Sequence, residues 1–262
     1  MITSNQNAKI QWVRKLQTQK KERQISSCYV MEGIRLIEEA SKGAVPLRLV
    51  LYTTPISDRG AEIIREIQTR EIDVEEVSAS VMKSISDTES PQGILAVAES
   101  QLLPLPENPN FILILDAIHD PGNLGTLIRT AAAAAVDLIL LAPDCADLFS
   151  PKVIRSGMGA HLRVPLRQFS WEEIRSYLQN FPQINILASD MEGNRSLWQQ
   201  NLTMQTAIII GSEAEGICKE AEQLASDKIF IPMAREVESL NAAIAAGVLM
   251  FEVVRQREAN KK

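Results

Sequence analysis

Apolar and polar positions along the chain follow two periods, one typical of strands and one typical of helices. Residues 111–115, FILIL, form an unbroken apolar run that is too short for a helix and predicts a strand buried on both faces. Turn-forming residues follow, and from Leu124 the apolar positions recur at helical spacing. Residues 136–141 then form a second apolar run. These segments together predict one strand–helix–strand unit of a parallel sheet.

The same two periods predict further elements on both sides of this unit. Strands are expected at 28–31, 47–52, 72–77, 94–98, 184–188, 207–210 and 228–231. Helices are expected at 5–23, 34–40, 61–69, 81–85, 151–156, 171–180, around 221 and at 240–257. Strands that alternate with helices indicate an α/β fold. The last helix is apolar on nearly every side, so we expect it to be covered on nearly every side.

A proline-rich segment divides the chain in two. Residues 101–110, QLLPLPENPN, contain three prolines and can continue neither a helix nor a central strand. We therefore predict a small α/β domain with a basic amino-terminal helix at 1–100, a linker at 101–110 and a second α/β domain at 111–262.

Charge narrows the class of protein. The 262 residues carry a formal net charge of −6, which argues against a protein that coats nucleic acid non-specifically. A local basic patch is nevertheless present in the first helix, where it is formed by Lys9, Arg14, Lys15, Lys20, Lys21 and Arg23. This patch fits either a solvated helix face or a contact with nucleic acid.

Cysteine usage and hydropathy indicate the compartment. Cys28, Cys145 and Cys218 form no CxxC pair, so we expect neither disulfides nor structural zinc. His119 and His161 have no ligand-like companions, and we expect no metal site. No apolar run approaches 18 residues, and the amino terminus lacks an apolar core behind its charges, so we expect neither a membrane span nor a secretory signal. The predicted location is the cytoplasm, with no membrane partner.

Three loops at predicted strand ends carry the polar residues that could do chemistry. The first, DPGNLG, contains Asn123 and opens the helix that carries Arg129, near the carboxyl end of a buried strand, where open α/β sheets bind ligands. The second, GSEAEG at 211–216, follows another buried strand. The third places Ser239 and Asn241 before the apolar helix. Each loop alone also fits an ordinary helix cap or turn, and Arg129 alone fits an ion pair with a nearby acid.

Taken together and in this order, the three loops resemble the motifs of the SpoU (TrmH-type) branch of the SPOUT RNA methyltransferases. The matching segments are DPGNLGTLIRTA, IIIGSEAEG and IFIPMAREVESLNAAIAAG. Residues 24–98, which include SPQGILAVA, also resemble the small ribosomal-protein-like substrate-binding domain of that family. One departure is Ala214, where family members usually have glycine; if the position requires a positive φ, alanine strains the loop.

The resemblance implies a fold and an activity. The fold is α/β, with a SPOUT-type parallel sheet, a carboxyl-terminal trefoil knot and a small α/β substrate-binding domain before it. The activity is transfer of a methyl group from S-adenosyl-L-methionine to the ribose 2′-hydroxyl of a nucleotide. The expected partner is RNA rather than DNA, with rRNA favoured over tRNA. The resemblance further implies a homodimer in which the partner completes the site.

The resemblance also implies roles for single residues. The catalytic group would comprise Asn123, Arg129, Glu213, Ser239 and Asn241. The cofactor would be held chiefly through backbone groups of Gly211, Ile231 and Leu240, with Ala188, Ile210 and Pro232 beside them. We expect Arg129 to orient the hydroxyl and to stabilise developing negative charge, because a guanidinium stays protonated at neutral pH and is a poor base. Glu213 or water would then accept the proton.

Two functions from other classes remain open at this point. One is a non-catalytic RNA-binding protein with the same fold, and the presence of every catalytic residue named above argues against it. The other is an NAD-dependent oxidoreductase on an ordinary doubly wound sheet. The chain lacks the glycine fingerprint and the downstream acidic residue that such an enzyme uses.

Overall fold

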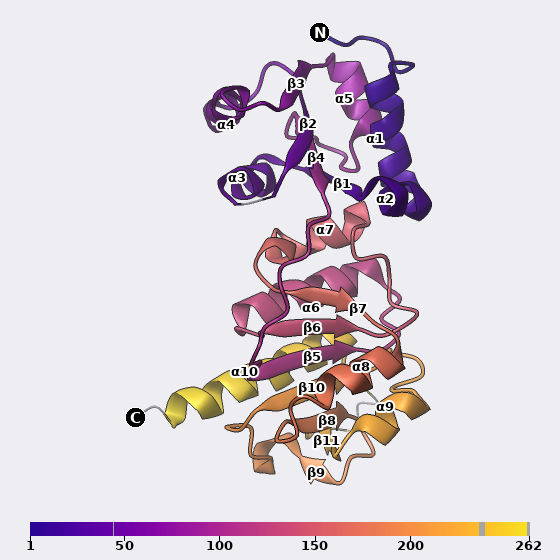
Figure 1. The fold of residues 1–262 in the computed structure, drawn as a ribbon, viewed down its shortest axis with the longest axis vertical. Coiled ribbons are helices and arrows are strands. Elements are labelled where there is room, and N and C mark those ends of the chain that lie inside the picture. The colour runs from indigo at the N-terminus through magenta and orange to yellow at the C-terminus, as the bar shows by residue number, and fades with distance from the viewer. Residues whose placement is uncertain (44, 236–238, 261–262) are drawn as a thin grey trace. The chain divides into compact units, whose positions relative to one another are not determined.

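The computed structural model describes residues 1–43, 45–235 and 239–260 and divides into two compact units (Figure 1). The first unit comprises Met1–Gln101 together with Phe149–Leu162. The second comprises Leu102–Leu148 and Arg163–Lys262. Residues 149–162, which lie within the predicted second domain, therefore pack with the first unit.

The first unit is a four-stranded sheet with helices on both faces. Its elements are α1 (Ala8–Thr18), α2 (Lys20–Ser26), β1 (Cys28–Glu32), α3 (Ile34–Lys42), β2 (Leu47–Tyr52), α4 (Asp58–Gln68), β3 (Asp73–Glu76), α5 (Ala79–Ile85), β4 (Ile94–Glu99), α7 (Pro151–Gly157) and the 3₁₀ turn η1 (Ala160–Leu162). The strand order is β1-β4-β2-β3, and only the β2–β3 pair of these is parallel. Apolar residues of α3, α4 and α7 cover one face, and those of α1 and α5 cover the other.

The predicted basic helix at 5–23 is wrong as a single helix. Gln19 has an extended backbone (φ −119°, ψ 110°) and separates α1 from α2. The buried guanidinium of Arg23 donates hydrogen bonds to the carbonyls of Leu16 and Gln17, which are left without helical partners at the end of α1. Lys9 is also engaged, since its ammonium lies 2.6 Å from Asp73 and 2.8 Å from Glu75. Two cations of the predicted basic patch therefore stabilise the unit itself.

The second unit is built on a seven-stranded sheet in which every neighbouring pair is parallel. Its elements are β5 (Phe111–Leu115), α6 (Pro121–Ala133), β6 (Leu138–Leu141), β7 (Leu166–Gln168), α8 (Trp171–Leu178), β8 (Asn185–Ser189), β9 (Arg195–Ser196), the 3₁₀ turn η2 (Leu197–Gln199), β10 (Thr206–Ile210), α9 (Lys219–Leu224), β11 (Asp227–Phe230) and α10 (Ala242–Ala259). The strand–helix–strand unit predicted at 111–141 is confirmed. The edge strands β7 and β9 are not predicted, because two or three residues are too few to display a period.

The strand order of this sheet, β7-β6-β5-β10-β8-β11-β9, brings distant loops together. β10 lies between β5 and β8, and Ile210 is in register with Leu115. Because the strands are parallel, the loops that follow β5, β8, β10 and β11 leave the sheet at one edge. This edge is where open α/β sheets bind ligands.

Helix α10 is covered less completely than its sequence predicts. Ala246, Leu249 and Met250 are buried, but Ile244 is 59% exposed and Phe251 is 49% exposed. The expectation of cover on nearly every side is therefore not met by the single chain.

The carboxyl end of α10 is held by polar contacts. The Gln256 side chain accepts a hydrogen bond from the Leu202 N–H and donates one to the Gln200 carbonyl. The Arg257 guanidinium donates to three backbone carbonyls, those of Asn110, Leu202 and Met204, and lies 5.2 Å from the ring centre of Phe111. These contacts fix the helix to the segment before β10 and to the start of β5.

None of the helices among the described residues is both long and apolar enough to cross a bilayer.

Candidate active site

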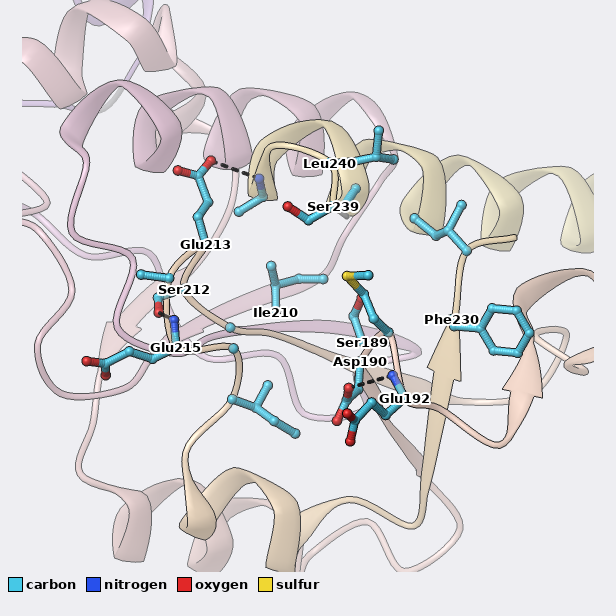
Figure 2. Close-up of a pocket in the computed structure, with 18 of the residues that line it drawn as sticks. Ser189, Asp190, Glu192, Ile210, Ser212, Glu213, Glu215, Phe230, Ser239 and Leu240 are labelled. Carbon is cyan, nitrogen blue, oxygen red and sulfur yellow. Dashed lines mark hydrogen bonds between the residues drawn. The ribbon is translucent and has the colours of Figure 1, made fainter. Parts of the chain in front are cut away.

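A pocket of about 540 Å³ opens at the carboxyl edge of the second unit's sheet (Figure 2). The loop after β8, the loop after β10, the end of β11 and the start of α10 supply its walls. The lining residues are Ser189–Glu192, Ile210–Ile217, Glu222, Phe230, Ile231, Met233, Ser239, Leu240, Ala242 and Ala245. Figure 2 shows Ser212, Glu213 and Glu215 on one side of the pocket and Asp190 and Glu192 on another.

The first motif forms the start of α6, three residues earlier than the sequence predicts. Asp120 is the N-cap, and its carboxylate accepts a hydrogen bond of 2.8 Å from the Asn123 N–H. Pro121 occupies the first helical position, where its missing N–H costs nothing. Asn123 therefore lies in the first turn of a rigidly capped helix at the sheet edge.

The second motif is a closed turn between β10 and α9. Ser212 and Gly216 exchange two backbone hydrogen bonds of 2.9 and 3.0 Å. At Gly211 an added Cβ would lie 2.1 Å from the Gly216 carbonyl oxygen, so no larger residue fits there. Gly216 has the left-handed backbone, with φ +69°. The described non-glycine residues with positive φ do not include Ala214, so the strain anticipated for alanine at this position does not arise.

Glu213 joins the three motifs. Its Oε1 accepts hydrogen bonds from Asn123 Nδ2 (2.9 Å), Asn241 Nδ2 (2.5 Å) and the Ala242 N–H (3.0 Å). Asn241 Nδ2 also donates to Asn123 Oδ1 at 3.1 Å. The last of the Glu213 contacts is to the open amino end of α10, where a carboxylate is stabilised by unpaired N–H groups. Residues separated by 90 and 118 positions in the chain are thus hydrogen-bonded to one another.

The remaining predicted catalytic residues lie in different surroundings. Ser239 is exposed and lines the pocket. The N-cap of the last helix is Asn241 rather than Ser239, and its Oδ1 accepts hydrogen bonds from the Ala243 and Ile244 N–H groups. Glu236, Val237 and Glu238, which belong to the third motif, fall outside the described residues.

Arg129 is not among the residues that line the pocket. It follows Asn123 by six residues, which places it about 9 Å farther along α6 and about one and two-thirds turns around it. Its side chain is exposed and makes no hydrogen bond or ion pair with any described residue. Arg129 therefore lies outside the pocket of its own chain, and its role stays a prediction.

The predicted cofactor residues surround the pocket. Ile210, Gly211, Ile231 and Leu240 line it, whereas Ala188 and Pro232 do not. Ala188 is fully buried and directly precedes the lining residue Ser189, and Pro232 directly follows Ile231.

Acidic groups dominate the charge of the pocket. Asp190, Glu192, Glu213, Glu215 and Glu222 line it, and no described lining residue is basic. Lys228 stands behind two of these carboxylates, with its ammonium 2.9 Å from Asp190 and 2.6 Å from Glu222. Burial acts to raise the pKa of Asp190, but Lys228 and the Glu192 N–H outweigh it and lower the pKa. Both carboxylates raise the pKa of Lys228.

Sequence reasoning missed two contributions to this site. The acidic loop after β8, which includes Asp190 and Glu192, carries no motif, and only the strand order brings it to the pocket. Asp116 was also missed, although it directly follows the apolar run FILIL. A carboxylate at the end of a fully buried strand was the signal that could have found it. Among the described residues no group of three or more His, Cys, Asp or Glu is placed to hold a metal ion.

Comparison with known proteins decides the family. The model of the SpoU rRNA methylase family matches residues 110–251, which is more than half of the chain. The chain belongs to the SpoU rRNA methylase family. A second model, the MRM3-like substrate binding domain, matches residues 7–96 of this SpoU-family chain.

Named relatives resemble the SpoU-family chain along nearly all of its length. A protein of Synechocystis called an uncharacterized tRNA/rRNA methyltransferase is 32% identical, over 98% of this chain and 94% of its own. The 23S rRNA (guanosine(2553)-2′-O)-methyltransferase RlmP of Bacillus subtilis is 30% identical, over 96% and 98%. The crystal structure of the SpoU methyltransferase AviRb from Streptomyces viridochromogenes in complex with AdoMet has a TM-score of 0.90 at 26% identity, over 97% and 99%.

Proposed function

We propose that this protein transfers a methyl group from S-adenosylmethionine to the ribose 2′-hydroxyl of a nucleotide in ribosomal RNA. The observation that carries the proposal is the Glu213 cluster, defined as Asn123, Glu213, Asn241 and the Ala242 N–H, at an acid-lined pocket. The B. subtilis relative, which aligns over almost the whole of both chains, is named for 23S rRNA, and this favours rRNA over tRNA.

The lining of the pocket fits S-adenosylmethionine. Apolar side chains of Ile210, Ile231 and Leu240 can contact an adenine ring, and backbone at Gly211 can approach it closely because no side chain intervenes. The carboxylates of the lining suit the positive sulfonium and ammonium groups. The diphosphate of NAD would instead face five carboxylates in a lining without a described basic residue, which argues against an oxidoreductase. When bound, S-adenosylmethionine supplies an electrophilic methyl group attached to sulfur.

The residues of the chain would then bind and activate the ribose hydroxyl. Oε1 of Glu213 already accepts three N–H donors, so Oε2 is the oxygen with capacity left for a hydroxyl or its proton. Ser239, exposed at the pocket, positions the ribose. The Asn123 and Asn241 amides hold the carboxylate in one orientation, which is the preorganisation that a proton acceptor requires.

The function is tested by calorimetry with S-adenosylmethionine and by methylation of ribosomal RNA that lacks its natural methyl groups. Binding of the cofactor together with label in ribose 2′-O positions supports the proposal. A protein that binds RNA but takes up no S-adenosylmethionine would instead be a non-catalytic member of the fold. Label in tRNA alone would replace ribosomal RNA as the substrate.

A homodimer is part of the proposal, because Arg129 lies outside the pocket of its own chain. Ile244, Val248 and Phe251 follow one another at helical spacing and form an apolar stripe on α10 that the single chain leaves partly uncovered. A second copy that covers this stripe could also bring its own Arg129 to the pocket. The trefoil knot and a cytoplasmic location likewise remain predictions.

Phe251→Asp should convert the dimer into a monomer in analytical ultracentrifugation at micromolar concentration, because a charge in the stripe cannot be buried without a partner. The methylation rate should fall as the dimer is lost. Met204→Asp is the matched control, since Met204 is also apolar and 57% exposed but lies in the loop before β10. A wild-type protein that sediments as a monomer would contradict the dimer.

The cations of α1 and α2 that are not used within the unit should bind RNA phosphates. Lys15, Lys20 and Lys21 are exposed, in contrast to Arg23. Lys20→Ser with Lys21→Ser should raise the KM for RNA by about tenfold and reduce its salt dependence, with cofactor affinity unchanged. Lys42→Ser with Arg48→Ser removes equal charge from α3 and β2 and should have little effect. Equal KM values for the two double variants would rule out this surface.

Charge removal is a cleaner test than deletion of residues 1–100. Residues 149–162 belong to the same compact unit, and Ile154 is part of its buried core. A deletion would therefore expose apolar surface in the part that remains.

A further inference from the structure

Asp116 is a buried carboxylate for which the proposed chemistry has no use. It directly follows β5 and is 3% exposed. Burial of a charge is costly unless hydrogen bonds compensate for it, and an apolar residue would continue the run of β5 at no such cost. The contacts of Asp116 therefore indicate what it does.

Asp116 holds both ends of the second-motif loop. Its backbone N–H donates to the Ile210 carbonyl at 2.9 Å, at the point where the loop leaves β10. Its Oδ2 accepts a hydrogen bond of 2.6 Å from the Cys218 N–H, where the loop enters α9. The enclosed segment, 211–217, contributes every one of its residues to the lining of the pocket.

The enclosed loop has little freedom to adjust. Gly211 has no space for a Cβ beside Gly216, and Ser212 and Gly216 are joined by two backbone hydrogen bonds. The position of Glu213 is thus set by where the two ends of the loop are fixed. Burial, and less strongly the Asp116 carboxylate, raise the pKa of the Cys218 thiol to about 11, so the thiol stays uncharged beside Asp116 at neutral pH.

We infer that Asp116 is a positioning residue: through the Cys218 N–H it holds the second-motif loop in the shape that presents Glu213 to Asn123 and Asn241. The nature of the ligand, S-adenosylmethionine, rests on the proposed function, but the anchoring of the loop does not. The role needs an acceptor oxygen that is fixed on the sheet, and β5 supplies it because it is the direct neighbour of β10.

Asp116→Ala should weaken S-adenosylmethionine binding in calorimetry by about tenfold to a hundredfold, the usual effect of losing a hydrogen bond to a charged group. Asp116→Asn keeps an acceptor oxygen and should restore most of the affinity. Cys218→Pro removes the donor instead, at a residue whose φ of −77° suits proline, and should match Asp116→Ala. Hydrogen exchange of the loop amides in the unliganded protein should accelerate in Asp116→Ala and Cys218→Pro.

Thr206→Val is the control for a merely structural effect. Thr206 is a fully buried polar residue at the other end of β10, and its hydroxyl donates to the Met204 carbonyl. Thr206→Val should lower the unfolding temperature without changing cofactor affinity or the hydrogen exchange of the loop amides. Wild-type affinity and exchange in Asp116→Ala would overturn the inference, as would a loss in Asp116→Asn equal to that in Asp116→Ala. If the wild type binds no S-adenosylmethionine, only the proposed function is refuted. Hydrogen exchange of the loop amides still tests whether Asp116 anchors the loop.

Discussion

Gly211→Ala should abolish cofactor binding. The added methyl group would lie 2.1 Å from the Gly216 carbonyl oxygen and 2.2 Å from its carbonyl carbon, both backbone atoms that cannot rotate away. The turn would have to open, and Glu213 would move with it. Displacements of about 1 Å at a reacting centre cost on the order of a hundredfold in rate, so we also expect the methylation rate to fall by at least that factor. Calorimetry and single-turnover methylation measure the two effects separately.

Gly216→Ala is a matched control for this substitution within the same loop. It adds the same methyl group at a position where nothing lies within 4 Å. Its φ of +69° makes alanine unfavourable by about 1–2 kcal/mol, but no contact is violated. The loss of cofactor affinity in Gly216→Ala should therefore be about tenfold. If Gly211→Ala binds the cofactor as well as Gly216→Ala does, the closed turn is not needed for the site.

Arg129→Ala should lower the single-turnover rate on the order of a hundredfold or more, with smaller effects on cofactor and RNA affinity. The guanidinium is expected to stabilise charge that develops on the ribose oxygen, so its loss affects the transition state more than the ground state. Arg129→Lys should restore only part of the rate, because an ammonium cannot reproduce the planar fork. A near wild-type rate in Arg129→Ala would remove Arg129 from the chemical step.

A mixing experiment tests which chain's pocket Arg129 serves. Arg129→Ala and Glu213→Gln are each expected to be inactive alone. If Arg129 completes the partner's site, one site in each mixed dimer is intact, and an equal mixture should regain about a quarter of the wild-type activity. If Arg129 serves its own chain, every site in the mixture carries a defect, and mixing restores nothing. Recovery of activity would support the dimer and the role of Arg129 together.

The sequence predicted the core elements well because their signal is local. The apolar runs at 111–115 and 207–210 are buried on both faces, and a strand of this kind is visible in the sequence without its neighbours. Ile10, Val13 and Leu16 recur at helical spacing in the first helix, and all three are buried. The break at Gln19 was invisible, because it depends on Arg23 folding back onto α1.

The site was predictable only in part, because its contacts are not local. The family resemblance pointed to Asn123, Glu213 and Asn241, and the structure brings these three together through the placement of β10 beside β5. Spacing placed Arg129 on α6, but it could not show that this residue lies outside the pocket of its own chain. The contact of Asp116 with the second-motif loop, and the place of the acidic loop after β8, depend on strand order, which a single sequence does not contain.

The most direct test of the account is a map of 2′-O-methyl groups in the ribosomal RNA of cells with and without this protein. We predict that cells without it lose methylation at a defined ribose. Wild-type protein should restore the mark, whereas Glu213→Gln protein at equal abundance should not. An unchanged map, or full restoration by Glu213→Gln, would contradict the central claim that the Glu213 cluster methylates ribosomal RNA.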